Sequence, residues 1–206
     1  TPSYRYCGQY NREMLEVALA SNIRTVVLSS RWTNWRIDEP ANAVEKSVDI
    51  RLEWDGRPAP RGSNHFLFER GFAELVGQLT AAGKRVVVVG PLPEPQFDVP
   101  ELLYVQRFGL APKANPVSRF DYERRHARIL AYFSDLRARY PVTVLEPVEA
   151  LCTGTSCAIR DRYGPRYFDH NHLTVRTAKA LAPLYEPIFR DSVDIAPATP
   201  KAAAVR

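Results

Sequence analysis

An aspartate, two histidines and an asparagine occupy four consecutive positions within "RYFDHNHLT", residues 166–174, and two of the chain's four histidines lie there. A histidine can take a proton from a serine hydroxyl if a carboxylate fixes its tautomer and stabilises the imidazolium that forms. Asp169 and His172 are three positions apart, so one tight loop can present both side chains together. We therefore expect His172 to be a general base that Asp169 orients, and His170 to point elsewhere.

Two other interpretations of this stretch stay open. Cys152 and Cys157, followed by His170 and His172, superficially resemble a zinc finger. The last two ligands of a finger have about three to five residues between them, whereas a single residue separates these histidines, so we expect no metal site. The remaining alternative is an ordinary polar loop, in which Asp169 caps a turn and the histidines are solvated.

The composition is that of a soluble globular protein. The chain has 206 residues, of which 45% are hydrophobic and 25% charged, and its net charge is +5. That length favours one domain, which we place at residues 1–190, with a disordered tail over 191–206, where apolar residues are few. No apolar run is long enough to span a membrane and no export signal is recognisable. Basic residues are scattered among acidic ones, which argues against a nucleic-acid partner.

The pattern of apolar residues predicts an α/β fold. Continuous β-branched runs are typical of strands that are covered on both faces, and they cover residues 25–28, 85–89 and 142–145. Helical spacing occurs in residues 11–21, 68–84, 124–141 and 174–190, the last with Thr174 as its N-cap and Leu181, Leu184 and Ile188 on one side. This alternation predicts a parallel sheet between helix layers. Residues 36–63 are expected to be an antiparallel excursion or a long loop.

Ligands of open parallel sheets bind beyond the carboxyl ends of the strands. The first strand ends in "SSRWTNW", where Arg31, Trp32 and Asn34 combine hydrogen-bond donors with a large aromatic face. Such a mixture suits the binding of a carbohydrate or an ester. The alternative is that the tryptophans cap the core beside a solvated arginine. The proline-rich segment 90–100 after the second strand has few donors, so we expect a rigid wall there.

Four stretches together resemble a known superfamily: "TVVLSSRW" (25–32), "GKRVVVVGPLPEPQFDVPELL" (83–103), "LEPVEALCTGTSCAI" (145–159) and "RYFDHNHLT" (166–174). They are similar to SGNH, or GDSL-type, esterases and acyltransferases, whose last motif is Asp-x-x-His in a loop before the final helix. The similarity is greater to the SGNH domain fused to the C-terminus of bacterial acyltransferase-3 membrane proteins. Those proteins O-acetylate surface polysaccharides.

The resemblance implies a three-layer αβα sandwich with a mostly parallel sheet, and a Ser-His-Asp triad that needs no metal or other cofactor. It also implies a disulfide between Cys152 and Cys157. It further implies a periplasmic location on the bacterial inner membrane, with tethering through an upstream transmembrane domain. That membrane domain would deliver the acyl donor, and a carbohydrate would be the acceptor.

The Gly-Asp-Ser motif that carries the nucleophile of such domains is not found in these residues. We therefore expect the first strand and the catalytic serine to lie upstream of Thr1, together with a partner for Cys7, and this fragment alone to be inactive. Ser29 and Ser30 occupy the place of oxyanion and substrate groups, so we do not expect either to be the nucleophile.

A second departure concerns the oxyanion. The family's Gly-x-Asn-Asp loop is replaced by "SSRWTNW", so Arg31 or Asn34 is expected to donate to the oxyanion. The resulting hypothesis is an O-acyltransferase that passes an acyl group, most simply acetyl, to a glycan hydroxyl. Two alternatives stay open: a carbohydrate O-acetylesterase with the same residues, and a non-catalytic glycan-binding or partner domain.

Overall fold

A parallel sheet of three strands organises the molecule. The computed structural model describes residues 7–20, 22–32, 52–54, 57–58, 60, 62–95, 97–110 and 117–189. Within this part of the chain the strand order is β1-β4-β6, with β1 at Thr25–Ser29, β4 at Arg85–Val89 and β6 at Val142–Leu145. Both pairings are parallel. The three strands expected from the β-branched runs are thus confirmed.

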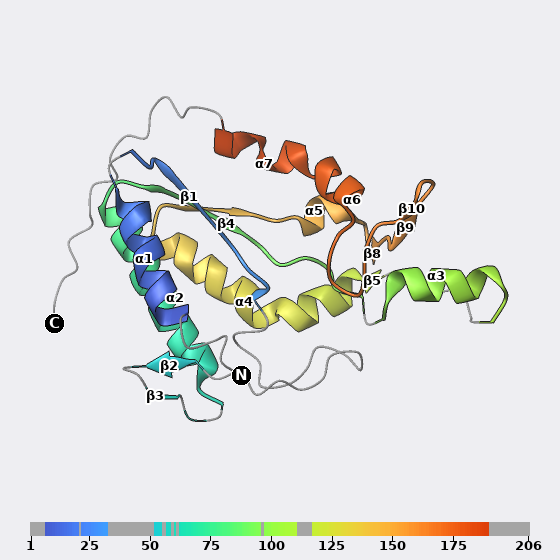
Figure 1. Ribbon diagram of the computed structural model, residues 1–206, viewed down its shortest axis with the longest axis horizontal. Helices are drawn as coiled ribbons and strands as arrows, with labels where there is room; N and C mark the ends of the chain where they lie inside the picture. Colours follow the sequence, from blue (N-terminus) through green and yellow to red (C-terminus); the bar gives the residue numbers. More distant parts are fainter. Residues whose placement is uncertain are drawn as a thin grey trace.

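Helices lie on both sides of this sheet, which confirms the expected αβα arrangement (Figure 1). Helices α2 (Asn64–Ala81) and α4 (Arg119–Arg139) cover one face, with α1 (Cys7–Leu19) beside α2. Helix α7 (Ala182–Phe189) lies on the other side, where the Pro187 carbonyl accepts a hydrogen bond from Arg85. The side chain of Ser118 caps α4 by accepting from the Asp121 amide, and Pro141 follows its last turn.

The main core fills the space between the sheet and helices α2 and α4. Val86 and Val88 of the central strand pack there with Leu79 of α2 and Leu136 of α4, and all four are fully buried. Trp32 extends this core, since its indole ring meets Phe68, Phe72 and Phe133 edge to face. The sheet is therefore held from one side by aliphatic and aromatic packing, which fixes the carboxyl ends of the strands in place.

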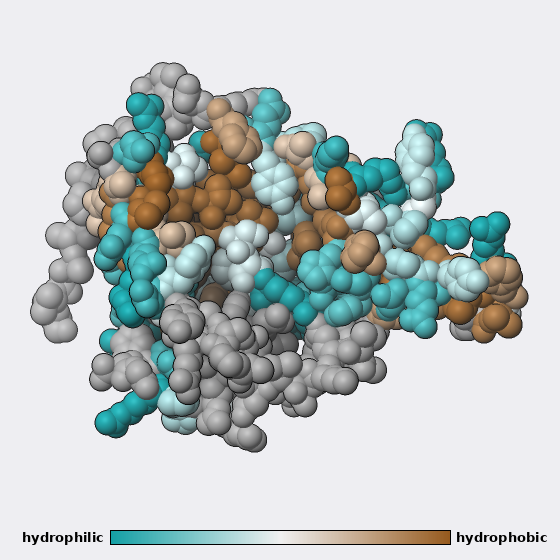
Figure 2. All heavy atoms as spheres, viewed as in Figure 1, coloured by the Kyte–Doolittle hydropathy of each residue, from teal (hydrophilic) through white to brown (hydrophobic). Residues whose placement is uncertain are grey.

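One face of β1 is only partly covered by the described residues. Val27 is 44% exposed, and β1 has a partner on one edge only within the described residues. Helix α7 is apolar but contains no buried residue, and apolar side chains gather at the surface near it (Figure 2). The expectation that all three strands are covered on both faces is therefore wrong for β1, because the described residues cover the face that carries Val27 only in part.

Small elements surround the carboxyl end of the sheet. The expected antiparallel excursion within 36–63 is present as β2 (Glu53–Trp54) paired with β3 (Arg57–Pro58). Strands β5 (Val117–Ser118), β7 (Cys152–Thr153) and β8 (Ser156–Cys157) form a second sheet. Strand β5 precedes α4, whereas β7 and β8 follow the short helix α5 (Val148–Leu151). A disulfide joins Cys152 to Cys157 across β7 and β8, as the resemblance implies. Strands β9 (Arg160–Asp161) and β10 (Gly164–Pro165) form a hairpin.

Two helical segments differ from the sequence prediction. Helix α3 (Val99–Arg107) was not expected, although Asp98 caps it by accepting from the Glu101 amide and a proline lies in its first turn. The predicted helix over 174–190 is divided into α6 (Val175–Ala180) and α7, with Leu181 between them. Thr174 is the N-cap of α6, as predicted, because its hydroxyl accepts from the Thr177 amide.

The proposed tail, residues 191–206, lies outside the described residues, so the domain boundary at residue 190 stays a prediction. Among the helices that are described, none combines the length and the apolar character that crossing a bilayer requires.

The core packing leads to a stability prediction. Leu136→Ala should lower the free energy of unfolding by about 2–5 kcal/mol, because it opens a cavity beneath the central strand. Leu110→Ala is the control, since Leu110 is among the exposed apolar residues, and it should change the free energy by less than about 0.5 kcal/mol. Guanidinium unfolding followed by tryptophan fluorescence measures both. Equal effects of the two substitutions would contradict this description of the core.

Candidate active site

The Asp-His stretch forms a tight antiparallel loop before α6. The Thr174 amide donates to the Arg166 carbonyl at 2.9 Å, and the Phe168 amide donates to the His172 carbonyl at 2.7 Å. Tyr167 and Leu173 face each other between these two pairs. The buried Tyr167 donates its hydroxyl proton to the Pro93 carbonyl, 2.9 Å away, in the segment after β4. The loop is thereby fixed to the carboxyl end of the sheet.

Asp169 and His172 meet directly within this loop. The Asp169 Oδ2 atom lies 2.6 Å from His172 Nδ1, and Asp169 Oδ1 accepts from the backbone amides of Asn171 and His172 at 2.7 Å each. A carboxylate at Nδ1 favours the tautomer that carries its proton there. The Nε2 atom is then a hydrogen-bond acceptor, which is the state that a general base requires. The His172 side chain is 75% exposed.

The acidity of Asp169 follows from these bonds. Partial burial raises its pKa, but the two amide donors and the His172 ring outweigh burial and hold the pKa at about 2. The carboxylate therefore stays ionised throughout the pH range in which His172 could act as a base.

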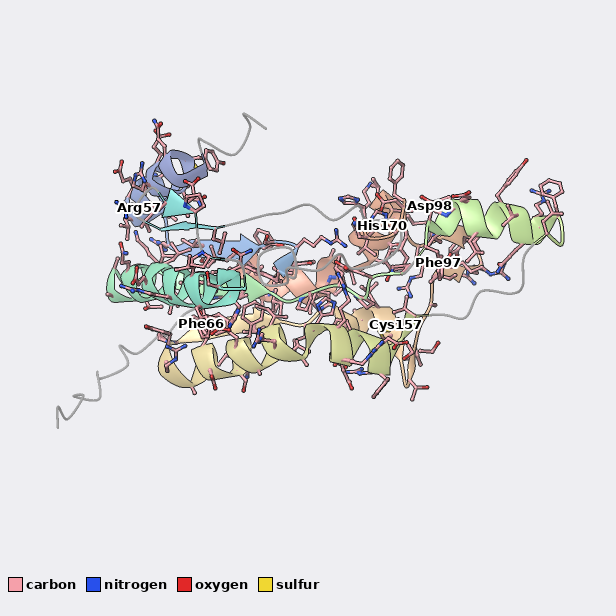
Figure 3. The ribbon with its side chains drawn as sticks, turned by 90° about the horizontal axis from the view of Figure 1, so that it is seen from below. Arg57, Phe66, Phe97, Asp98, Cys157 and His170 are labelled. Atoms are coloured by element: carbon pink, nitrogen blue, oxygen red, sulfur yellow. A yellow bond between two sulfur atoms is a disulfide. The ribbon has the colours of Figure 1, made fainter. Side chains whose placement is uncertain are left out.

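His170 contacts a different side chain from the one that His172 contacts. Its Nε2 atom lies 3.0 Å from the side-chain amide of Asn171. It lies at the end of the molecule where α3 begins (Figure 3). Of the two histidines in the loop, His172 is therefore the one that Asp169 orients.

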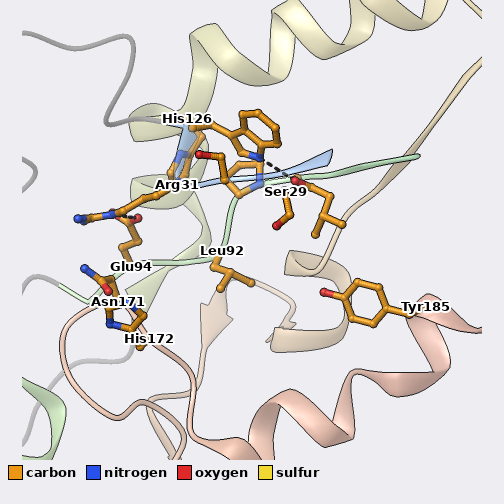
Figure 4. Close-up of a pocket in the computed structure, with 13 residues that line it drawn as sticks. Ser29, Arg31, Leu92, Glu94, His126, Asn171, His172 and Tyr185 are labelled. Atoms are coloured by element: carbon orange, nitrogen blue, oxygen red, sulfur yellow. Dashed lines mark hydrogen bonds and ion pairs between the residues drawn. The ribbon is translucent and has the colours of Figure 1, made fainter. Parts of the chain in front are cut away.

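A pocket of about 280 Å³ lies beyond the carboxyl ends of β1 and β4. Figure 4 shows Arg31, Glu94, Asn171 and His172 toward one end of this pocket and Tyr185 of α7 toward the other. Its remaining wall comes from the ends of both strands, the segments that follow them, and α4, namely Ser29, Ser30, Trp32, Val89, Gly90, Pro91, Leu92 and His126. The two exits that the sequence singled out thus join the Asp-His loop in one site.

Glu94 is a buried carboxylate between two arginines. Its oxygens accept from Arg31 Nε at 2.8 Å and Arg31 Nη2 at 3.0 Å, and also from Arg125 of α4 at 2.7 and 3.0 Å. Burial raises the pKa of Glu94, but the two guanidinium groups lower it further, so the net shift is downward. The two hydrogen bonds to Glu94 fix the orientation of the Arg31 guanidinium. Two arginines and one carboxylate together leave a net positive charge of one beside the pocket.

His126 of α4 is a second polar residue at this site that the sequence analysis did not identify. Burial lowers its pKa to about 4, against the attraction of Glu94, so the ring is neutral near pH 7. The Leu92 carbonyl lies near enough to favour the charged ring, yet neither ring nitrogen forms a hydrogen bond of normal geometry. The sequence signal for His126 was a histidine on the buried face of a helix. The signal for Glu94 was an acidic residue in the proline-rich segment that follows a buried strand.

The remaining predicted residues have different outcomes. Trp32 is buried and donates its indole N–H to the Val89 carbonyl at 2.7 Å, so it belongs mainly to the core although part of it lines the pocket. Asn34 lies outside the described residues. Among residues that the structure does describe, no group of three or more His, Cys, Asp or Glu side chains is placed to hold a metal ion.

A parallel sheet between helices, with an aspartate–histidine loop beyond its strands, defines an SGNH-type α/β domain. The family model described as "SGNH domain (fused to AT3 domains)" matches residues 1–187. The chain belongs to this family.

Among solved structures, the chain is similar to the periplasmic domain of a lipopolysaccharide acetyltransferase from Salmonella ser. Paratyphi A. The TM-score is 0.54 at 16% sequence identity, and the match covers 87% of this chain and 62% of that one. At this identity the likeness shows a common fold. No curated protein matches the sequence.

The Asp169 bonds predict a pH dependence. Because folding lowers the pKa of Asp169 from 3.8 to about 2, the bonds stabilise the fold above pH 3.8, and this contribution is lost as the pH falls toward 2. A ¹³C NMR titration of the Asp169 carboxyl should therefore give a midpoint near 2. In the Asp169→Asn protein, the part of the stability loss between pH 3.8 and 2 that comes from Asp169 should be absent. A midpoint at 3.8 or above would contradict the hydrogen bonds described here.

Proposed function

We propose that this chain is the acyl-transferring domain of an O-acyltransferase that passes an acyl group, most simply acetyl, to a hydroxyl of a cell-surface glycan. The observation that carries the proposal is the 2.6 Å contact between Asp169 and His172 at the edge of a pocket beyond the sheet. Membership of a family of SGNH domains fused to AT3 domains supports acyl transfer as the reaction class.

The reaction has two halves. In the first, His172 Nε2 takes the proton of a serine hydroxyl while the serine oxygen attacks the donor's acyl carbonyl. The imidazolium gives that proton to the leaving group, which departs and leaves an acyl-serine. In the second half, His172 takes the proton of a sugar hydroxyl, whose oxygen attacks the acyl-serine, and then returns the proton to the serine. Asp169 stabilises the imidazolium in both halves.

The serine is proposed to come from a segment upstream of Thr1. Within the described residues, His172 Nε2 makes no hydrogen bond to a hydroxyl group. Among the described residues β1 is paired along one edge only, so its other edge offers a place for a further parallel strand. Such a strand would end beside Ser29, at the pocket that His172 lines. Its carboxyl end is thus where a nucleophile could meet the imidazole.

Arg31 is the proposed donor to the oxyanion that forms in both halves. Glu94 clamps its guanidinium through two hydrogen bonds, so little reorganisation is needed when negative charge develops on the acyl oxygen. The net positive charge of Arg31, Glu94 and Arg125 favours that charge. Asn34 remains the second candidate for this role.

The same family membership supports a proposal for the donor and the location. We propose that an AT3 membrane domain of the same protein hands over the acyl group, and that this domain works on the periplasmic side of the bacterial inner membrane. The structural neighbour, itself a periplasmic domain of an acetyltransferase, supports this placement.

Hydrolysis is the second candidate reaction, because the exposure of His172 gives water access to the same base. An esterase would use the same residues and transfer the acyl group to water. The ratio of acyl transfer to hydrolysis in the presence of a glycan acceptor distinguishes the two enzymes.

Removal of the base tests the proposed mechanism. In the full-length protein, His172→Ala should lower acyl transfer by about 10⁶-fold, because neither hydroxyl can then be deprotonated. His170→Ala is the matched control from the same loop, and it should remain active. The circular dichroism of both variants should match that of the wild type. Undiminished turnover by His172→Ala would exclude His172 as the base. No turnover by the wild type would favour a non-catalytic glycan-binding or partner domain.

Removal of the proposed oxyanion donor gives a second test. Arg31→Met should lower kcat by about 10²–10³-fold and change the acceptor KM much less, since the contact forms as charge develops. Arg70→Met, which removes an exposed arginine of α2 that pairs with Glu74, serves as the control. A change confined to KM, or equal effects of both variants on kcat, would exclude Arg31 from this role.

A further inference from the structure

Phe168 is exposed immediately before the Asp-His pair. Its side chain is 72% exposed. A single apolar side chain on a surface is ordinary, so exposure by itself assigns no role to Phe168. Its position relative to His172 carries the inference.

The hydrogen-bond register of the loop fixes that position. Thr174 pairs with Arg166, and Phe168 pairs with His172, through backbone hydrogen bonds, and the facing residues Tyr167 and Leu173 lie between these pairs. Side chains alternate between the two faces of such a pairing, and facing residues project to the same side.

The two sides of the loop have different surroundings. Tyr167 is buried, and Leu173 packs against the same cluster. Phe168 and His172 therefore both project to the opposite side, where they are 72% and 75% exposed. Facing residues of an antiparallel pair have Cβ atoms about 5 Å apart. The side chain of Phe168 therefore lies next to the imidazole of His172, the proposed base.

We propose that Phe168 is a binding residue for the acceptor, on which the apolar face of a pyranose ring stacks so that one of its hydroxyls meets His172 Nε2. This inference rests on the proposed function and names a pyranose as the substrate class. An aromatic ring suits the role because it offers a large apolar face with few rotatable bonds, so ordering it costs little conformational entropy. A sugar stacked there is also held for the second half of the reaction.

The inference separates transfer from hydrolysis. Water needs no stacking surface, so the loss of the ring penalises transfer to a sugar more than transfer to water. Phe168 thereby sets which acceptor takes the acyl group, while Asp169 and His172 supply the proton transfers that both reactions share.

The test uses the full-length protein with p-nitrophenyl acetate as the donor and a panel of methyl pyranosides as acceptors. Phe168→Ala should raise the acceptor KM about tenfold, the scale of one aromatic contact, and should lower the ratio of transfer to hydrolysis by the same factor. Phe168→Trp, which keeps an aromatic face, should leave the acceptor KM and the ratio of transfer to hydrolysis near their wild-type values. Phe66→Ala is the matched control, since Phe66 is 65% exposed on α2 and lies well away from His170 in Figure 3.

Three results would overturn the inference: equal acceptor KM values for Phe168→Ala and Phe66→Ala, parallel loss of transfer and hydrolysis in Phe168→Ala, or hydrolysis by the wild type without transfer to any pyranoside. Failure of the proposed function has a different signature. In that case His172→Ala would hydrolyse p-nitrophenyl acetate as fast as the wild type, whatever Phe168 does.

Discussion

The hydrogen bond between Asp169 and His172 is the interaction on which the proposed chemistry depends. The carboxylate also accepts two backbone amides of its own loop, so the loop conformation and the orientation of the imidazole are fixed together. Tyr167 anchors the loop to the segment after β4. The imidazole is thus held against the carboxyl end of the sheet, where the β1 and β4 exits form the pocket wall.

Charge at the pocket is arranged around one buried acid. Glu94 binds Arg31 from the β1 exit and Arg125 from α4, so three separate parts of the chain meet at a single carboxylate. His126 of α4 also lines the pocket, and its ring is neutral near pH 7 because burial disfavours the charged form. The positive charge that remains lies at the pocket end that His172 also lines, where a developing oxyanion would be stabilised.

Local patterns predicted the sheet and the Asp-His pair. The β-branched runs predict strands because each run can be recognised within its own short segment. The Asp169–His172 contact is likewise local, since the two residues are three positions apart in one loop. Glu94 escaped prediction because its contact with Arg31 spans 63 positions, which no local pattern reports. The partly exposed face of β1 was not predicted for a related reason. The composition of a strand does not tell which other elements cover its faces. Trp32 was ambiguous in sequence and became a core residue once Phe72 and Phe133 were placed around it.

Mapping the acylated residue tests the central claim most directly. The full-length protein is incubated with p-nitrophenyl acetate, quenched in acid, digested and analysed by mass spectrometry, beside its His172→Ala variant. We predict an acetylated serine in the segment upstream of Thr1 of the wild type, and none in the variant. Acetylation of Ser29 or Ser30, or equal acetylation of both proteins, would contradict a mechanism in which Asp169 and His172 activate an upstream hydroxyl.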